Sequence, residues 1–252
     1  MNHFLGLIQF LTRIPIKKNY DLGNDFYKSA IYFPLVGALL GTFYFFISLL
    51  ADMIFNPYIA SLIVLLSFVF LTGGLHLDGL GDTFDALFSN RDKDKMLQIM
   101  KDSRLGTNAL LAIVMILLFK LAFIFEIITL KQNWVLILVP ACARYAQITA
   151  CYNTKSPREN GMGNLFVGKI SGNRFFATTL IACMIVSTIN FMASKSFPVY
   201  LILIPITYLF TRRIVKFVYK KIDGITGDIL GCVCELSEVL CLLLVYLLIK
   251  YV

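Results

Sequence analysis

TGGLHLDGLGDTFDALFSNRDKDKMLQIMKDSRLG, residues 72–106, directly follows an apolar run and opens with paired glycines. Asp78, Asp82 and Asp85 in this stretch are four and three residues apart, so on a helix their carboxylates share one face. Carboxylates at this spacing repel one another unless a cation compensates them, and an oxygen-preferring ion such as Mg²⁺ fits best. The alternative is a solvated acidic helix start, because acids are favoured in a first turn. The glycines between the first two aspartates favour ion binding, because they cost helix stability and let a ligand approach the backbone.

The composition indicates a membrane protein rather than a soluble one. The 252 residues are 58% hydrophobic and 15% charged, whereas soluble domains carry about 25% charged residues. The apolar residues fall in long blocks, as in polytopic membrane proteins. The formal net charge of +8 does not indicate a nucleic-acid partner, because the lysines and arginines lie beside the apolar blocks in the positive-inside pattern. No cleavable signal peptide is expected, since residues 1–16 lack a charged start and a small-residue cleavage site.

The expected fold is an all-α, polytopic helical bundle of about seven spans, formed by one membrane-embedded domain over residues 1–252. The expected spans are 31–55, 58–75, 107–128, 133–152, 175–193, 197–210 and 229–249. Glycines in the first of these are expected to let another helix approach closely. With a cytoplasmic N-terminus, most of the 23 lysines and arginines lie in cytoplasmic loops. The candidate active site, which is carried by these loops, is therefore expected on the cytoplasmic face of the cell membrane.

A second group of acidic residues surrounds the start of the last expected span, at Asp223, Asp228, Glu235 and Glu238. A charge near the bilayer centre costs at least ~2.5 kcal/mol. Glu235 and Glu238 are therefore expected to be paired, to line a wet cavity, or to lie shallow and face water or a lysine. Arg144, inside the fourth expected span, is the natural counter-charge for Glu235, or else it binds a substrate phosphate.

The start of the last span repeats the layout of the first acidic motif. Thr226-Gly227-Asp228 places a carboxylate after a glycine and before an apolar helix. Two such clusters facing each other would form a cage for one or two Mg²⁺ ions. Because Mg²⁺ usually takes only one or two protein carboxylates, not all four candidate ligands need to bind directly. These candidates are Asp78, Asp82, Asp85 and Asp228.

Basic and polar residues near the acidic motifs suit phosphate recognition. Lys101, Ser103 and Arg104 lie in the segment KDSRLG, and Arg158 lies in a loop rich in glycine and asparagine. An arginine binds phosphate through its bidentate fork. The alternative for Arg104 and Arg158 is an ordinary basic residue next to the membrane. Serine and glycine beside Arg104 favour the functional interpretation, because they add a donor and an open backbone approach.

His76 abuts the acidic motif and could be a base, a phosphate donor or a metal ligand. A lone histidine is more often a hydrogen-bonded supporting group. Carboxylates, Mg²⁺ and guanidinium groups at a membrane surface together indicate phosphoryl-type transfer, in which an alcohol attacks a metal-neutralised phosphate in line. Spacing alone does not choose the nucleotide or the acceptor.

Several segments together resemble cobalamin synthase, the adenosylcobinamide-GDP ribazoletransferase family of bacteria and archaea. They are FLTRIP at 10–15, FPLVGALLG at 33–41, GGLHLDGLGDTFDA at 73–86, IMKDSRLGTNA at 99–109, SPRENGMG at 156–163 and TGDILG at 226–231. The matches keep their order along nearly the whole chain, and the pair HLDGLGDT and KDSRLG is the most specific. One departure is Gly81, where many relatives are expected to carry alanine.

The resemblance implies an integral membrane transferase that uses Mg²⁺ and has the lipid bilayer as a partner. It would join adenosylcobinamide-GDP to α-ribazole, or its 5′-phosphate, and release GMP in the last steps of cobalamin biosynthesis. The resemblance assigns metal binding to Asp78, Asp82, Asp85 and Asp228, phosphate recognition to Lys101, Ser103, Arg104 and Arg158, and catalysis to Asp82, Asp78 and His76. Arg144 is a further candidate substrate-binding residue. A homo-oligomer is possible.

The residues leave two other functions open. A CDP-alcohol phosphotransferase is the nearest enzyme, but its D-G-x-x-A-R order is absent, because Asp78-Gly79 is followed by Leu80, Gly81 and Asp82. A secondary transporter would use Arg144, Glu235 and Glu238 as an intramembrane coupling site. Substrate uptake without GMP release would distinguish the transporter from the transferase.

Overall fold

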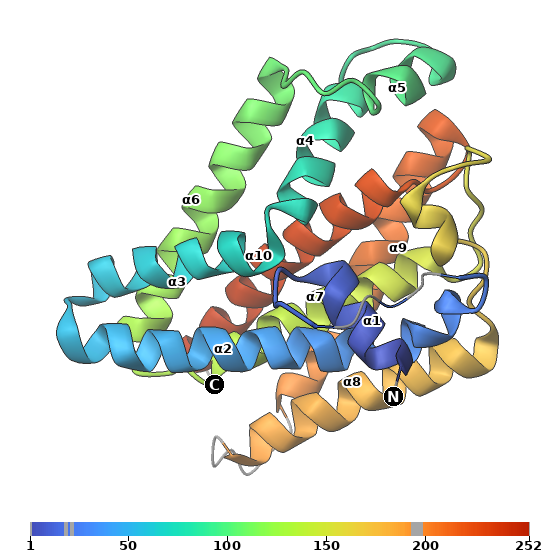
Figure 1. Cartoon of the computed structure of the whole chain (residues 1–252). Helices are drawn as coiled ribbons and strands as arrows, with labels where there is room; N and C mark the ends of the chain where they lie inside the picture. The colour runs from blue at the N-terminus through green and yellow to red at the C-terminus, as the bar shows by residue number, and fades with distance from the viewer. Residues whose placement is uncertain (1, 18–19, 21–22, 193–198, 252) are drawn as a thin grey trace.

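The structure is a computed structural model that describes residues 2–17, 20, 23–192 and 199–251. Over these residues it contains ten α-helices and three short 3₁₀ helices and no strand, so the all-α prediction is confirmed (Figure 1). The α-helices are α1 (Asn2–Leu11), α2 (Phe33–Ile54), α3 (Pro57–Thr72), α4 (Leu75–Leu87), α5 (Lys93–Ile99), α6 (Thr107–Thr129), α7 (Val135–Cys151), α8 (Gly172–Met192), α9 (Leu203–Ile222) and α10 (Gly227–Tyr251). The 3₁₀ helices are η1 (Phe26–Tyr32), η2 (Met162–Leu165) and η3 (Val199–Ile202).

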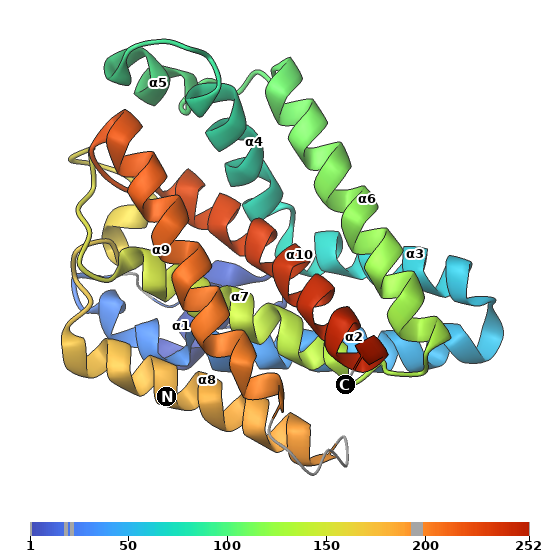
Figure 2. The ribbon, with the colours of Figure 1, turned by 180° about the vertical axis from the view of Figure 1, so that it is seen from behind.

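Helix α7 forms the centre of the bundle, and almost every one of its residues is buried. Helices α2 and α10 pack along it, and α8 and α9 cover it from the remaining side (Figures 1 and 2). Two glycines of α2 allow the closest of these contacts. A Cβ atom at Gly37 would lie 2.4 Å from the carbonyl oxygen of Pro140, and one at Gly41 would lie 2.6 Å from that of Leu136. The predicted close approach of another helix to the first span is therefore confirmed.

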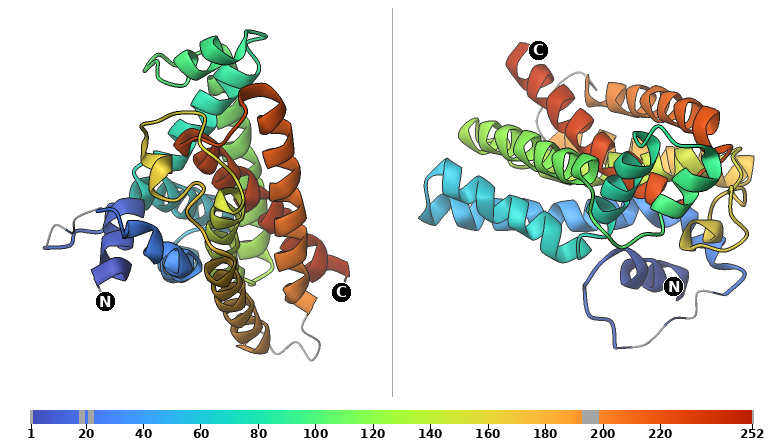
Figure 3. Two further views of the ribbon diagram at one scale, coloured as in Figure 1. Left: turned by 90° about the vertical axis from the view of Figure 1, so that its right-hand side faces the viewer. Right: turned by 90° about the horizontal axis from the view of Figure 1, so that it is seen from above.

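A sharp bend separates α3 from α4. Gly73 and Gly74 both have positive φ values, 65° and 71°, in the left-handed region that glycine adopts without a Cβ penalty. The axes of α3 and α4 consequently differ by 86°. Helix α6 packs against both halves of this broken unit, and α4 lies across α10 (Figures 1 and 3). The bend therefore directs the acidic motif back onto the end of the chain.

Several helices are long and apolar enough to cross a membrane, so the chain is a polytopic helical membrane protein. By length and composition they are 26–54, α6, α8 and α10, with α3 and α4 together as a fifth if they form one broken span. This is fewer than the seven spans predicted. Helix α7 has only 17 residues, and the second half of α9 carries lysines and arginines, so neither qualifies. Residues 193 and 197–198 of the predicted fifth and sixth spans lie outside the described residues.

The charged residues inside the bundle pair differently from the prediction. The ammonium group of Lys120 on α6 donates hydrogen bonds to Glu235, at 2.5 Å, and to Glu238 on α10, and all three side chains are buried. Arg144 on α7 contacts other groups, so the predicted Arg144–Glu235 pair is wrong. A transporter would use Arg144 and the two glutamates as a coupling site. In this structure the two glutamates pair with Lys120 instead of Arg144. The geometric reason is that α6, not α7, faces the glutamate side of α10.

Candidate active-site pocket

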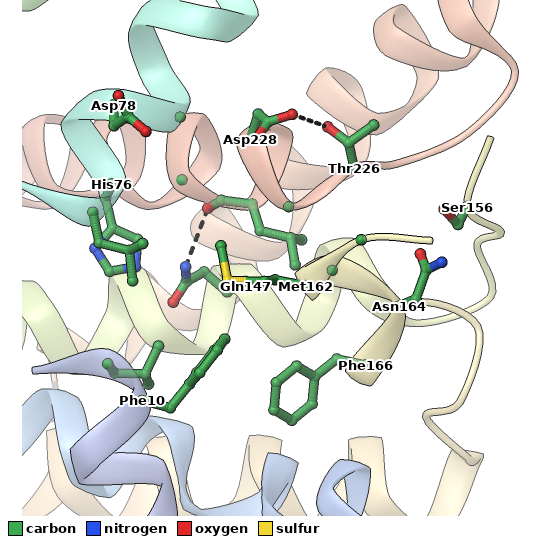
Figure 4. Close-up of a pocket in the computed structure, with 18 of the residues that line it drawn as sticks. Phe10, His76, Asp78, Gln147, Ser156, Met162, Asn164, Phe166, Thr226 and Asp228 are labelled. Atoms are coloured by element: carbon green, nitrogen blue, oxygen red, sulfur yellow. Dashed lines mark hydrogen bonds between the residues drawn. The ribbon is translucent and has the colours of Figure 1, made fainter. Parts of the chain in front are cut away.

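A polar pocket of about 120 Å³ lies where the starts of α4 and α10 meet the loop before η2 and the end of α1 (Figure 4). Three of the sequence motifs contribute to it: HLDG from α4, TGD from α10 and SPRENGMG from the loop. Side chains that line it include Phe10, Leu11, Phe33, His76, Asp78, Gln147, Ser156, Arg158, Asn160, Met162, Asn164, Phe166, Thr226 and Asp228. Segments far apart in the sequence therefore build one site.

The crossing of α4 and α10 brings two of the predicted carboxylates together. A Cβ atom at Gly79 would lie 2.7 Å from the carbonyl oxygen of Asp228, and one at Gly231 would lie 3.0 Å from that of His76. The two helix backbones therefore touch. Asp78 and Asp228, each in the first turn of its helix, line the same pocket (Figure 4). The sequence predicted two facing acidic clusters, and the structure places one carboxylate from each of them in the pocket lining. A first-turn position also favours a carboxylate, because it lies at the positive end of the helix dipole.

Asp228 is held by a hydroxyl and a guanidinium group. Its Oδ2 accepts hydrogen bonds from Thr226 Oγ1 at 3.2 Å and from Arg158 Nη1 at 3.4 Å. Arg158 also donates through Nη2 to the carbonyl oxygen of Leu97 at 3.0 Å. Its Nε is buried without a hydrogen-bond partner. The predicted substrate-binding Arg158 is thus fixed in the pocket wall next to a carboxylate and keeps one donor free.

A layer of polar side chains lies at and beneath the pocket floor. Arg144 Nη1 donates to His76 Nε2 at 2.7 Å and to Gln147 Oε1 at 3.0 Å, and Gln147 Nε2 donates to the carbonyl oxygen of Leu230 at 3.2 Å. A guanidinium group only donates hydrogen bonds, so His76 uses the Nε2 lone pair to accept this one. While this contact persists, His76 cannot use that lone pair as a general base. The geometry favours the supporting role that is usual for a lone histidine.

Arg144 itself does not line the pocket and is only 1% exposed. The prediction that it contacts substrate therefore finds no direct support in this structure. Its two direct neighbours, His76 and Gln147, are the side chains that reach the pocket surface. Arg144 thus contacts the pocket lining through these two side chains.

The other two aspartates of α4 lie away from the pocket lining. Asp82 is half-buried and follows Asp78 by one helical turn. Asp85 accepts hydrogen bonds from the backbone N–H groups of Gly106, at 2.6 Å, and Ala109, at 2.9 Å. These groups begin α6, so Asp85 caps that helix from a neighbouring one. These two hydrogen bonds explain the position of the Asp85 carboxylate without a bound metal ion.

The segment KDSRLG does not contribute to the pocket. Lys101, Ser103 and Arg104 are exposed, and none of them lines it. Arg104 pairs with Asp102 at 2.5 Å and is 87% exposed, and this hydrogen-bonded pairing lowers the pKa of the Asp102 carboxyl to about 2. The predicted phosphate-binding role of these three residues is therefore not reproduced by their positions in this structure.

Some pocket residues were not identified from the sequence. Gln147 follows Arg144 by three positions and therefore shares its helix face, which is a readable signal. Phe10, Phe33 and Phe166 come from separate segments and contact one another only in the folded chain. Apolar positions of this kind are indistinguishable from core positions in the sequence.

The carboxylates of the described residues do not gather into a metal-binding cluster. No group of three or more histidine, cysteine, aspartate and glutamate side chains within the described ranges is arranged to hold a metal ion. A four-carboxylate cage is therefore not present. Asp78 and Asp228 alone match the usual requirement of Mg²⁺, which binds one or two protein carboxylates and completes its shell with water and phosphate oxygens.

Fold and site together define a polytopic helical membrane protein with an acidic and arginine-containing pocket, in which three motifs of distant sequence position meet. A family model described as cobalamin-5-phosphate synthase matches residues 3–246. The chain therefore belongs to the cobalamin-5-phosphate synthase family, which confirms the resemblance noted in the sequence. No solved structure matches the chain.

Curated relatives extend over nearly the whole chain. A protein of Clostridioides difficile (strain 630) is 49% identical over 99% of this chain and 98% of its own length. A protein of Alkaliphilus metalliredigens (strain QYMF) is 44% identical over 94% and 92%, and one of Clostridium acetobutylicum is 37% identical over 95% and 94%. All three are named adenosylcobinamide-GDP ribazoletransferase. This chain is accordingly a transferase of the same family.

Proposed function

We propose that this chain joins adenosylcobinamide-GDP to α-ribazole, or to α-ribazole 5′-phosphate, with release of GMP and with the help of Mg²⁺. The family and the names of the relatives supply the reaction. The pocket formed by Asp78, Asp228 and Arg158 is the structural observation that carries the proposal. It combines carboxylates for a divalent ion with a guanidinium group for a phosphate, as the transfer of a phosphate-linked group requires.

The proposed reaction is an in-line displacement at the phosphate attached to cobinamide. The ribose 3′-hydroxyl oxygen forms the new P–O bond, the bond between that phosphate and GMP breaks, and the hydroxyl proton passes to a carboxylate. Arg158 lines the pocket, and its guanidinium group would bind the phosphate oxygens. Asp78 or Asp228 accepts the proton, since His76 already accepts a hydrogen bond from Arg144. Mg²⁺ held by these aspartates would neutralise charge on the diphosphate.

We place the protein in the cell membrane with this pocket on the cytoplasmic side. The excess of lysine and arginine in the loops that carry the motifs supports this orientation. A cytoplasmic pocket also suits soluble phosphorylated substrates. The proposal includes a homo-oligomer, for which no contact among the described residues provides an argument.

The test is a reconstitution of the full-length protein in lipid vesicles with both substrates. We expect GMP and a cobalamin-type product to form in equal amounts with Mg²⁺ and to disappear when the ion is chelated. Asp78→Asn and Asp228→Asn should each lower the turnover rate about 100-fold or more. The matched control is Asp223→Asn, because Asp223 is an exposed aspartate paired with Lys93 and does not line the pocket.

Other outcomes would identify the alternative functions. Displacement of CMP from a CDP-alcohol would favour a phosphotransferase of that class. Ion-driven uptake of substrate into the vesicles without GMP would favour a transporter. Product formation that is unchanged by chelation would overturn the role of Mg²⁺ but not the transfer reaction.

A further inference from the structure

The pocket has two chemically different sides. Asp78, Thr226 and Asp228 lie on one side, and Phe10 and Phe166 lie on the other, with Met162 between them (Figure 4). The acidic side accounts for an ion and a phosphate. The aromatic side has no role in that chemistry, so it remains to be explained.

Three phenylalanine side chains, Phe10, Phe33 and Phe166, form this aromatic wall. The ring of Phe166 lies 5.0 Å from that of Phe33 and 6.1 Å from that of Phe10, measured between centroids. Phe26 supports the wall from behind, 5.8 Å from Phe10 and 5.4 Å from Phe166, and does not line the pocket. Edge-to-face and tilted contacts at these distances are favourable. Phe33 and Phe166 are only 3% and 2% exposed, so the wall presents mainly the partly exposed ring of Phe10 to the pocket, with the two buried rings holding it in place from behind.

We infer that the aromatic wall binds the flat base of the α-ribazole substrate, with the attached ribose directed toward Asp228. This inference rests on the proposed function and specifies where one of its two substrates binds. A base that stacks on an aromatic ring gains affinity without needing hydrogen-bond partners. A ribose that extends from there reaches the side of the pocket where the phosphate would be attacked.

The chemistry of the wall distinguishes this base from the guanine of the other substrate. Guanine carries hydrogen-bonding groups along its edge, and burying them against phenylalanine carbon would leave them unpaired, which is unfavourable. The outer edge of the ribazole base carries methyl groups and has no such requirement.

Met162 provides an adjustable cover for a bound ring. Its side chain is 64% exposed and projects into the pocket between the two sides (Figure 4). A methionine side chain is flexible and makes favourable contacts with aromatic rings. The base would consequently lie between the fixed phenylalanine wall and this movable thioether.

The experiment compares two phenylalanines of α1. Phe10 and Phe4 are both partly buried and pack on the same core, but only Phe10 lines the pocket, while Phe4 contacts Tyr32. In reconstituted full-length protein, Phe10→Ala should raise the KM for α-ribazole on the order of ten-fold, the size expected when one stacking ring is lost. The KM for adenosylcobinamide-GDP should stay within about two-fold. Phe4→Ala should leave both values near those of the unmodified protein, and Phe10→Leu should give an intermediate KM for α-ribazole.

The outcomes separate this inference from the function on which it rests. No product from the unmodified protein would overturn the proposed function. Normal turnover with an equal KM for α-ribazole in Phe10→Ala and Phe4→Ala would overturn only the inference. A selective rise in the KM for adenosylcobinamide-GDP in Phe10→Ala would place the guanine on the wall and would likewise overturn it. If Phe10→Ala does not fold, the comparison between Phe10→Leu and Phe4→Ala decides.

Discussion

Arg144 Nη1 lies 2.7 Å from His76 Nε2, and the same nitrogen lies 3.1 Å from the sulfur of Cys234 on α10. Cys234 in turn lies 3.9 Å from Glu238, which pairs with Lys120. A continuous chain of buried polar groups therefore runs from the pocket floor to α6. Two cations and two glutamates balance within it, which lowers the cost of keeping charges in an apolar bundle.

This series of buried polar contacts predicts that Arg144 positions His76 rather than contacting substrate. Arg144→Lys keeps the charge but cannot reach the same acceptors with one ammonium group. We expect kcat to fall about 10–100-fold, as for loss of a supporting contact, with little change in either KM. His76→Gln should cause a similar loss, and the double variant should be no worse than the single ones, because coupled residues are not additive. Additive losses, or a large rise in KM for one substrate, would show that Arg144 acts on the substrate directly.

The contact between α4 and α10 predicts opposite outcomes for two neighbouring glycines. Gly79→Ala would place a methyl group 2.7 Å from the backbone oxygen of Asp228, so the helices must separate and the pocket must distort. Gly81→Ala would meet side-chain atoms rather than backbone, those of Ala109 and Ile113 at 3.2 Å and of Leu105 at 3.7 Å, so a shift of a few tenths of an ångström accommodates it. We expect activity to fall at least 100-fold in the first variant and less than about three-fold in the second. Activity assays at matched expression levels test this, and equal effects would contradict the packing described.

The buried ion pairs predict a large stability effect at Lys120. Lys120→Met leaves Glu235 and Glu238 without their counter-charge, which typically costs about 3–5 kcal/mol. Thermal unfolding in detergent should therefore occur at a clearly lower temperature. The control is Lys131→Met, which removes a lysine that pairs with Asp52 but is 67% exposed, and which should have a small effect. The triple variant Lys120→Met, Glu235→Gln, Glu238→Gln should recover part of the lost stability, and no recovery would argue against charge as the cause.

Variants of Asp85 can distinguish a role in capping helix α6 from a role in metal binding. Asp85→Ala removes the acceptor for the N–H groups of Gly106 and Ala109 and should lower the free energy of unfolding by about 1–2 kcal/mol. Asp85→Asn keeps one amide oxygen as an acceptor and should be milder. The Mg²⁺ concentration for half-maximal activity should not change in either variant. A several-fold increase in that concentration would instead make Asp85 a ligand.

The sequence alone determined the class of the protein and the identity of its motifs. The long apolar blocks required helices, because backbone groups in lipid must be hydrogen-bonded within their own segment. Asp78, Asp228 and Arg158 were candidates from their motifs, and all three line the pocket in the structure. Local pattern suffices for these features, because each depends on neighbours within a few residues.

Tertiary structure decided which of the candidate groups meet. Asp78 and Asp228 line the same pocket, whereas Asp85 caps α6. Arg104 pairs with Asp102. Lys120 pairs with the glutamates that were expected to pair with Arg144. The aromatic wall also depended on how the helices pack. The physical reason is that a carboxylate or guanidinium group binds whatever partner the packing places within about 3 Å. That distance is set by contacts between helices far apart in the sequence.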